Sequence, residues 1–382
     1  MALVLLVKLV GLAKPEYDYL PTAEWKLPPA LDKFKPSSSP AGVNVHTVHG
    51  PDSTTSVAQW RSEQMWAPPG EKVMTRVVKQ RKGSYHDTTV IFMHGLGESP
   101  FDCVVAAQLR PRLRTIRFVL PESPVQPVTA VGGNLTSGWF DIHKIPYEYA
   151  SDQDEAGVLL GVRKLNAVIR HERDELIRNL RLGAHLDSLA DDNFDDMGIL
   201  DVVVDGTLAL DDKDAFGTPA ERAWAMSRIV LGGFSQGSVV ALTTALTAPH
   251  PVGGLMALSG FMPLRNKLAS LTADLHRTDL PIFMAHGEID KVIPWTESKT
   301  SLALLRADGP NERGEGGLGL NAIEYHTYER VAHTWFPVEF FQIGNWMEKV
   351  VPRSRRMPPG WNAEGSQQVD EEPKLAEVEW NA

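Results

Sequence analysis

The chain has 382 residues, of which 43% are hydrophobic and 23% charged, and this length suits one large globular domain with additional segments. Its 38 Lys and Arg stand against 48 Asp and Glu, and the formal net charge of −10 argues against nucleic acid or anionic lipid as a partner. A single cysteine, Cys103, excludes an intrachain disulfide and a cysteine-rich metal site, and it favours a reducing, cytoplasmic location.

Both ends of the chain are predicted to lie outside the folded core. Residues 1–13 are apolar but contain Lys8, and they have neither the length of a membrane span nor the basic start and cleavage site of a signal peptide. We therefore expect no integral membrane association. Residues 1–72 are rich in Pro, Ser and Gly and predict a mostly irregular extension, whereas residues 353–382 predict a disordered tail.

Between these ends, in residues 73–352, short apolar runs alternate with helical patterns. Strands buried on both faces are predicted at 88–95, 115–121, 228–235, 253–260, 281–287 and 322–329. Helices are predicted at 154–180, 237–248, 295–307 and 337–351. This alternation indicates an α/β fold with a mostly parallel central sheet flanked by helices, in which ligands bind at the carboxyl ends of the strands.

The segment GGFSQGS places Ser235 between Gly233 and Gly237, where a predicted strand passes directly into a predicted helix. In this context the G-x-S-x-G pattern is typical of a sharp turn with a strained serine that stands above the sheet. The two glycines keep the crowded neighbouring backbone clear of it. A glycine-rich strand exit is the alternative, but the flanking strand and helix favour Ser235 as a nucleophile.

A serine hydroxyl becomes a good nucleophile when a base takes its proton and an acid orients that base. In enzymes with this turn, the order along the chain is Ser, then Asp or Glu, then His, each after a strand. Asp290 and His333 occupy those places. Glu288 comes earlier in the same turn, and Asp279 precedes the strand on the opposite edge of the sheet, so Asp290 is the favoured acid.

Three other histidines compete with His333 for the role of base. His326 lies inside a predicted strand, whereas His94 and His286 end strands and are suited to holding loops through hydrogen bonds. The order along the chain and the position in a loop favour His333.

The reaction also requires N–H donors for the negative oxygen that develops on the substrate. One is expected to be the backbone N–H of Gln236, the residue after the nucleophile, and the other to come from a loop after an early strand. The loop HGLGES, residues 94–99, fits that position, and Leu96 is its best donor. An ordinary glycine-rich turn is the alternative for this loop.

Five stretches, taken in chain order, resemble landmarks of the acyl-protein thioesterase and phospholipase/carboxylesterase family of the α/β-hydrolase superfamily. They are TVIFMHGLGES, PVTAVGGNLTSGWFDI, IVLGGFSQGS, HGEIDKVIP and VAHTWFPVEFFQIGNWM. The resemblance implies a serine esterase or thioesterase that cleaves acylated proteins or small acyl esters without a metal or a cofactor. The site residues that it implies are the triad Ser235, Asp290 and His333 and the oxyanion donors Leu96 and Gln236. The oligomeric state stays open.

The resemblance further implies an apolar channel for the acyl chain, bordered by the loop of Trp139 and Phe140, for which a structural aromatic pair is an equal alternative. The sequence departs from the family in its long N-terminal extension and in having no cysteine after Met1 for lipidation. These departures bear on membrane recycling and protein substrates. A catalytically silent receptor or scaffold with the same fold is the alternative function.

An acidic insertion is predicted at residues 184–219, which contain ten Asp and one Lys. Its Asp-rich stretches fail as calcium-binding loops because required glycine or acidic positions hold other residues. The stretch VVVDGTLAL fits a hairpin with a turn at Asp205 and Gly206. The preceding helix returns the chain to the amino-terminal edge of the sheet, so we expect the insertion to lie away from Ser235.

Overall fold

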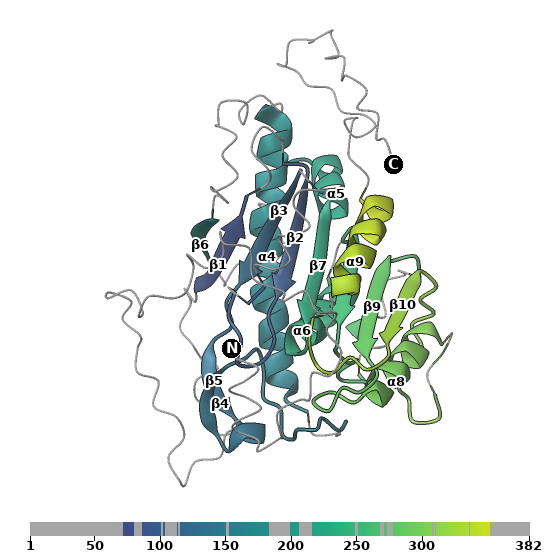
Figure 1. The fold of residues 1–382 in the computed structure, drawn as a ribbon. Coiled ribbons are helices and arrows are strands. Elements are labelled where there is room, and N and C mark those ends of the chain that lie inside the picture. The colour runs from purple at the N-terminus through teal and green to yellow at the C-terminus, as the bar shows by residue number, and fades with distance from the viewer. Residues whose placement is uncertain are drawn as a thin grey trace, which may run out of the picture.

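An eight-stranded sheet lies at the centre of the protein, with helices on both of its faces (Figure 1). The computed structural model describes residues 72–351 with gaps. The gaps are residues 80–85, 101, 104–112, 114, 150–152, 183–198, 206–215, 249–250, 268–270, 273–277, 308, 310 and 336. None of the helices within these described ranges is both long and apolar enough to cross a membrane.

The strands agree closely with the alternating pattern of the sequence. They are β1 (Lys72–Val78), β2 (Thr88–Met93), β3 (Ile116–Pro121), β4 (Val125–Val128), β5 (Asn134–Ser137), β6 (Ile199–Asp205), β7 (Ile229–Phe234), β8 (Gly254–Leu258), β9 (Ile282–Gly287) and β10 (Ile323–Tyr328). The helices are α4 (Glu155–Leu182), α5 (Pro219–Ser227), α6 (Gln236–Thr247), α8 (Trp295–Arg306) and α9 (Pro337–Val350), with a 3-10 turn η2 (Thr129–Val131). All six predicted strands and all four predicted helices are therefore confirmed.

The strand order in the main sheet is β10-β9-β8-β7-β2-β3-β1-β6. Neighbours from β10 to β3 are parallel, whereas β1 is antiparallel to both β3 and β6. The mostly parallel sheet predicted from the sequence is confirmed. Because parallel strands end at one edge, the turns that follow β2, β7, β9 and β10 are brought toward one another at that edge.

Two separate hydrophobic cores cover the two faces of the sheet. In β2, Ile91 and Met93 point into one core, and Val90 and Phe92 point into the other, because successive side chains of a strand alternate in direction. The first core receives apolar residues of α4, α5, α6 and α8, and the second receives those of α9. Burial on both faces explains why these strands are almost continuously apolar.

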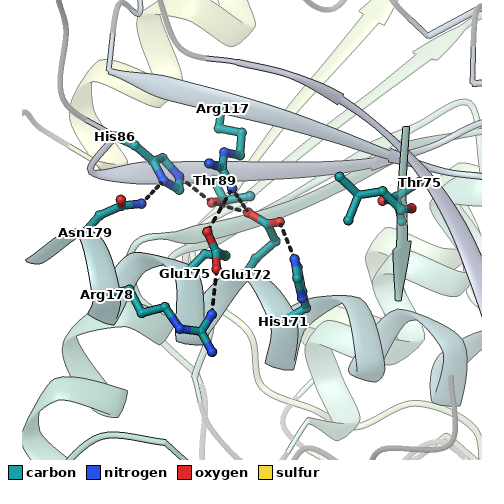
Figure 2. Close-up of polar contacts among 10 residues, drawn as sticks. Thr75, His86, Thr89, Arg117, His171, Glu172, Glu175, Arg178 and Asn179 are labelled. Carbon is teal, nitrogen blue, oxygen red and sulfur yellow. Dashed lines mark hydrogen bonds and ion pairs between the residues drawn. The ribbon is translucent and has the colours of Figure 1, made fainter. Parts of the chain in front are cut away.

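A buried polar cluster joins α4 to the first residues of β2 and β3 (Figure 2). The Glu172 carboxylate accepts a hydrogen bond from Thr89 Oγ1 at 3.2 Å and lies 3.4 Å from Arg117 Nη1. His86 lies 2.8 Å from Thr89 Oγ1 and 2.9 Å from the side-chain amide of Asn179. Burial raises the pKa of Glu172 and lowers the pKa of His86. The cluster thus orients α4 through groups whose charged forms are disfavoured.

Part of the acidic insertion is built into the main sheet. Strand β6 pairs with β1 along its whole length, from Ile199 opposite Val78 to Asp205 opposite Lys72. The expectation that the insertion lies away from the edge of Ser235 is wrong for this strand, because its Asp205 end reaches that same edge. It does so four strand positions away from β7. The second arm of the predicted hairpin, from residue 206 onward, lies outside the described residues.

The last residues assigned to the insertion belong to the main body instead. Phe216 packs against the first core, and Thr218 caps helix α5. The Thr218 hydroxyl accepts a hydrogen bond from the Glu221 N–H at 3.2 Å, and the Glu221 carboxylate accepts one from the Thr218 N–H at 2.6 Å. This reciprocal pair is a capping box, with Pro219 at the start of the helix.

Candidate active site

Ser235 lies in the sharp turn between β7 and α6. Its backbone has φ 54° and ψ −123°, a conformation that is strained for a residue with a side chain. A Cβ on Gly237 would stand 2.2 Å from the Met93 carbonyl oxygen, and one on Gly233 would stand 2.4 Å from the Gly237 carbonyl carbon. Only glycine fits at these two positions, so the crowded turn predicted from the sequence is present.

The structure brings Ser235, His333 and Asp290 together from three different turns. His333 Nε2 lies 2.8 Å from Ser235 Oγ, and His333 Nδ1 lies 2.6 Å from Asp290 Oδ2. The three residues are 5%, 6% and 6% exposed in the same order. They follow β7, β10 and β9, whose carboxyl ends share one edge of the sheet. A proton path from a serine hydroxyl to a carboxylate-oriented imidazole is therefore in place.

The Asp290 carboxylate is held by four donors. Oδ1 accepts hydrogen bonds from the backbone N–H groups of Val292 at 2.8 Å and Ile293 at 2.9 Å. Oδ2 lies 2.6 Å from His333 Nδ1 and 3.3 Å from His286 Nε2. Burial disfavours the ionised carboxylate, but the charge of His333 and the hydrogen bonds from the two histidines outweigh it, so the pKa of Asp290 is held well below its usual range.

His286 is a neighbour of Asp290 whose place in the site was not read from the sequence. Its Nε2 lies 2.8 Å from the Ile293 carbonyl oxygen, so that nitrogen carries the proton and donates it. The same N–H faces Asp290 on the side away from His333. The expectation that His286 holds a loop through a hydrogen bond is thus confirmed.

The competing candidates make other contacts. Glu288 accepts a hydrogen bond from Thr327 Oγ1 at 2.7 Å. His326 Nε2 lies 2.9 Å from the carboxylate of Glu324. His94 lies 2.8 Å from the Gly95 carbonyl through Nδ1 and accepts the Ser123 N–H at 3.1 Å through Nε2.

The loop predicted to supply an oxyanion donor lies against the serine. A Cβ on Gly95 would stand 3.1 Å from Ser235 Cβ. The turn is held by the Gly97 N–H, which donates to the Ser137 carbonyl at 2.7 Å, and by the Gly95 N–H, which donates to the Glu98 carboxylate at 2.7 Å. Leu96, in the middle of this turn, lines the same pocket as Ser235.

The side chain of Gln236 ties the loop of Trp139 and Phe140 to the nucleophile turn. Its Oε1 accepts the Trp139 backbone N–H at 2.7 Å, and its Nε2 donates to the Phe140 carbonyl at 2.5 Å. The Trp139 indole N–H donates to the His94 carbonyl at 2.9 Å. The residue expected to donate its backbone N–H to the oxyanion therefore also anchors the neighbouring loop.

A small, mainly apolar pocket of about 20 Å³ opens beside Ser235. It is lined by Gly95, Leu96, Glu98, Ile142, Ile145, Tyr147, Phe234, Ser235, Val292, Ile293 and His333. A second, larger pocket, of about 320 Å³, shares Ile142 and Tyr147 with the first and includes Phe140. Trp139 is 2% exposed and is not among the described residues that line either pocket, so its contacts are those of a structural aromatic residue.

Metal ions in proteins are held by several converging donor side chains. Within the described ranges, no group of three His, Cys, Asp or Glu side chains is arranged to hold a metal ion.

Comparisons with known proteins match the parts of the chain on both sides of the insertion. A family model described as phospholipase/carboxylesterase matches residues 74–182 and 218–351, and residues 183–217 fall between the two matched segments. Acyl-protein thioesterase 1 of Mycosarcoma maydis is 33% identical over 281 residues, which cover 73% of this chain and 97% of that protein. Acyl-protein thioesterase 1 of Yarrowia lipolytica is 30% identical over 267 residues, covering 69% of this chain and 92% of that protein.

The solved structures that are similar to this one agree in fold. A variant of Arabidopsis thaliana SOBER1 superposes with a TM-score of 0.50 at 23% identity, covering 69% of this chain and 99% of that one. At this identity the likeness bears on the fold alone.

Proposed function

The chain belongs to the phospholipase/carboxylesterase family and is a serine esterase or thioesterase, and we propose that it works through an acyl-enzyme formed on Ser235. The observation that carries the proposal is the hydrogen-bonded chain from Ser235 Oγ through His333 to Asp290. The proposed substrates are acylated proteins or small acyl esters, and the proposed location is cytoplasmic.

In the first half of the reaction, Ser235 Oγ attacks the carbonyl carbon of the thioester or ester. His333 Nε2 takes the hydroxyl proton, while Asp290 accepts the hydrogen bond from Nδ1–H and stabilises the imidazolium that forms. The carbonyl oxygen becomes negative and receives hydrogen bonds from the backbone N–H groups of Leu96 and Gln236. The tetrahedral intermediate then collapses, and His333 returns the proton to the departing thiol or alcohol.

In the second half, water replaces the leaving group. His333 takes a proton from the water while the water oxygen attacks the acyl carbon, and the N–H groups of Leu96 and Gln236 again donate to the oxyanion. Collapse breaks the bond to Ser235 Oγ, which regains the proton from His333, and the free carboxylic acid leaves. The step needs no metal and no cofactor.

The apolar pocket is the proposed site for the acyl chain. Its walls of Ile142, Ile145, Val292 and Ile293 offer contacts that grow with each buried methylene, at about 0.8 kcal/mol each. The relatives in Mycosarcoma maydis and Yarrowia lipolytica carry the name acyl-protein thioesterase 1, which supports an acyl group as the part of the substrate that is recognised.

Labelling with a fluorophosphonate probe, combined with hydrolysis of p-nitrophenyl esters and acyl thioesters of increasing chain length, tests the proposal. We expect the wild-type protein to be labelled and active and Ser235→Ala to be neither. A folded wild-type protein that is neither labelled nor active on any member of the panel would favour the silent scaffold.

A further inference from the structure

Glu98 is a second carboxyl group in the reaction pocket, and the proposed mechanism does not use it. It lines the pocket together with Ser235 and His333. Its side chain folds back along its own turn, so that Oε2 accepts the Gly95 N–H at 2.7 Å. A Cβ on Gly95 would stand 3.0 Å from Glu98 Oε2 and 3.1 Å from Ser235 Cβ. Both the carboxyl group and the nucleophile therefore lie on the side of Gly95 from which a side chain would project.

The bond from Gly95 to Glu98 closes the turn that presents Leu96. The Glu98 N–H donates to the Gly95 carbonyl at 3.3 Å, a long bond that defines the turn only weakly. The outer side of the turn is held by β5, because the Gly97 N–H donates to the Ser137 carbonyl and the Ser137 hydroxyl donates to the Glu98 carbonyl, both at 2.7 Å. The Glu98 side chain supplies the matching restraint on the inner side, next to the proposed oxyanion donor.

We propose that Glu98 is a positioning residue, whose carboxyl group fixes the Gly95–Glu98 turn for oxyanion binding and whose ionisation sets an upper pH limit for hydrolysis. The inference rests on the proposed function of Ser235. A neutral carboxyl group still accepts the Gly95 N–H through its carbonyl oxygen. An ionised one accepts it as well but adds a negative charge beside the place where the substrate oxygen becomes negative, and like charges repel.

The electrostatic surroundings bring this ionisation close to neutral pH. Burial raises the pKa of Glu98 to about 7, and the charge of Asp102 acts in the same direction. The hydrogen bond from Gly95 and the positive charge of protonated His333 act in the opposite direction. Asp102 lies in the same segment, where it accepts hydrogen bonds from the N–H and hydroxyl groups of Ser99, and His333 follows β10.

The test compares the pH profiles of kcat for the wild-type protein, Glu98→Gln and Glu98→Ala. We expect the wild-type rate to fall on the alkaline side of its profile, the upper limb, as Glu98 ionises. The Gln variant keeps an oxygen acceptor for Gly95 and carries no charge, so its plateau stays within about threefold and its upper limb disappears. The Ala variant loses the acceptor. Its kcat falls ten- to a hundredfold, with little change in KM, since deletion of a full oxyanion donor costs about 10² to 10³.

Two further variants sharpen the test. Asp102→Asn removes a charge that favours the neutral form of Glu98, so the upper limb moves to lower pH. Glu288→Gln also removes a carboxylate, but one bonded to Thr327, and it keeps the wild-type profile. Thermal unfolding confirms that each variant is folded.

The outcomes separate the two proposals. An upper limb that is the same in wild type and Glu98→Gln, or an Ala variant with wild-type kcat, overturns the role of Glu98 while Ser235 remains labelled by fluorophosphonate. Loss of labelling and hydrolysis in the wild-type protein itself overturns the proposed function instead.

Discussion

Replacing Asp290 by Asn tests the proposed triad at the two carboxylate oxygens of Asp290, both of which accept hydrogen bonds. The Oδ1 atom faces two backbone N–H groups, those of Val292 and Ile293, and Oδ2 faces His333 Nδ1. The amide of the variant must place its oxygen at one position and its NH₂ group at the other. With the oxygen at the Oδ1 position, the NH₂ group donates toward His333 Nδ1, and the imidazole must then carry its proton on Nε2.

This tautomer cannot accept the proton of Ser235. Turning the amide around restores the acceptor for His333 but leaves the part-buried N–H of Val292 and the buried N–H of Ile293 without one, and an unpaired buried group costs about 1–3 kcal/mol. Either arrangement removes most of the base catalysis. We expect kcat to fall about 10⁴-fold, as for the equivalent change in a serine protease, which corresponds to about 5 kcal/mol in the activation free energy.

Hydrolysis of a p-nitrophenyl ester by purified protein measures the effect, with thermal unfolding as the check on folding. Glu288→Gln is the matched control, because it makes the same chemical change in the same turn at a carboxylate bonded to Thr327. The control should keep its wild-type rate. A fall of less than tenfold for Asp290→Asn, or a larger effect for Glu288→Gln, would refute the assignment of the acid.

Three further outcomes are expected. Ser235→Ala lowers kcat about 10⁴- to 10⁶-fold and removes fluorophosphonate labelling without changing thermal unfolding, since only one hydroxyl is lost; near-wild-type turnover would contradict this. Replacement of residues 184–215 by a Gly-Ser linker lowers Tm, because β1 loses its β6 partner. Hydrolysis of short- and long-chain esters stays within a few-fold of the wild-type rate, because β6 lies roughly 19 Å from β7. Selective loss of long-chain turnover would place the insertion at the acyl pocket. Glu221→Gln lowers stability by about 1 kcal/mol at pH 6 by weakening the capping box and the pair with Arg181. The hydrogen bond from Arg181 lowers the pKa of Glu221 from 4.5 to about 2, so this stabilisation is present above pH 4.5 and is lost as pH falls through 2, where the two Tm values should meet.

The central part of the fold was predictable because its elements carry consistent patterns. Strand β2 is buried along its whole length, and its sequence is a continuous run of apolar and β-branched residues. Thr218, Pro219 and Glu221 form a capping-box signature that predicts the start of helix α5. The acidic run before them instead led to the prediction that Thr218 and Pro219 belong to the insertion.

Strand β1 was missed for a different reason. Its sequence KVMTRVV alternates between exposed and buried residues over part of its length and follows a Pro- and Gly-rich stretch. Its partners in the sheet are β3 and β6, and β6 arrives more than a hundred residues later in the chain. A pattern within seven residues cannot reveal such a partner.

In the site, the positions of Ser235, Asp290 and His333 could be predicted because chain order and strand ends determine them. The supporting contacts could not. Gln236 binds the backbone of Trp139 across 97 residues of sequence, and the fold of the Glu98 side chain onto Gly95 is a rotamer choice within one turn. Both depend on three-dimensional packing rather than on a local pattern.

The pairing of β6 with β1 affects the order in which the strands of the sheet unfold locally. Thr75 and Val202, joined by a hydrogen bond from the Thr75 hydroxyl to the Val202 carbonyl, lie 127 residues apart. Among the described strands β6 has β1 as its one neighbour, whereas β7 lies between β8 and β2, so β6 should detach at a lower free energy than β7. Amide hydrogen exchange would then be faster in β6 than in β7. Once β6 leaves, the backbone of β1 becomes an open sheet edge with Met74 beside it, a template on which a second copy of the chain can pair.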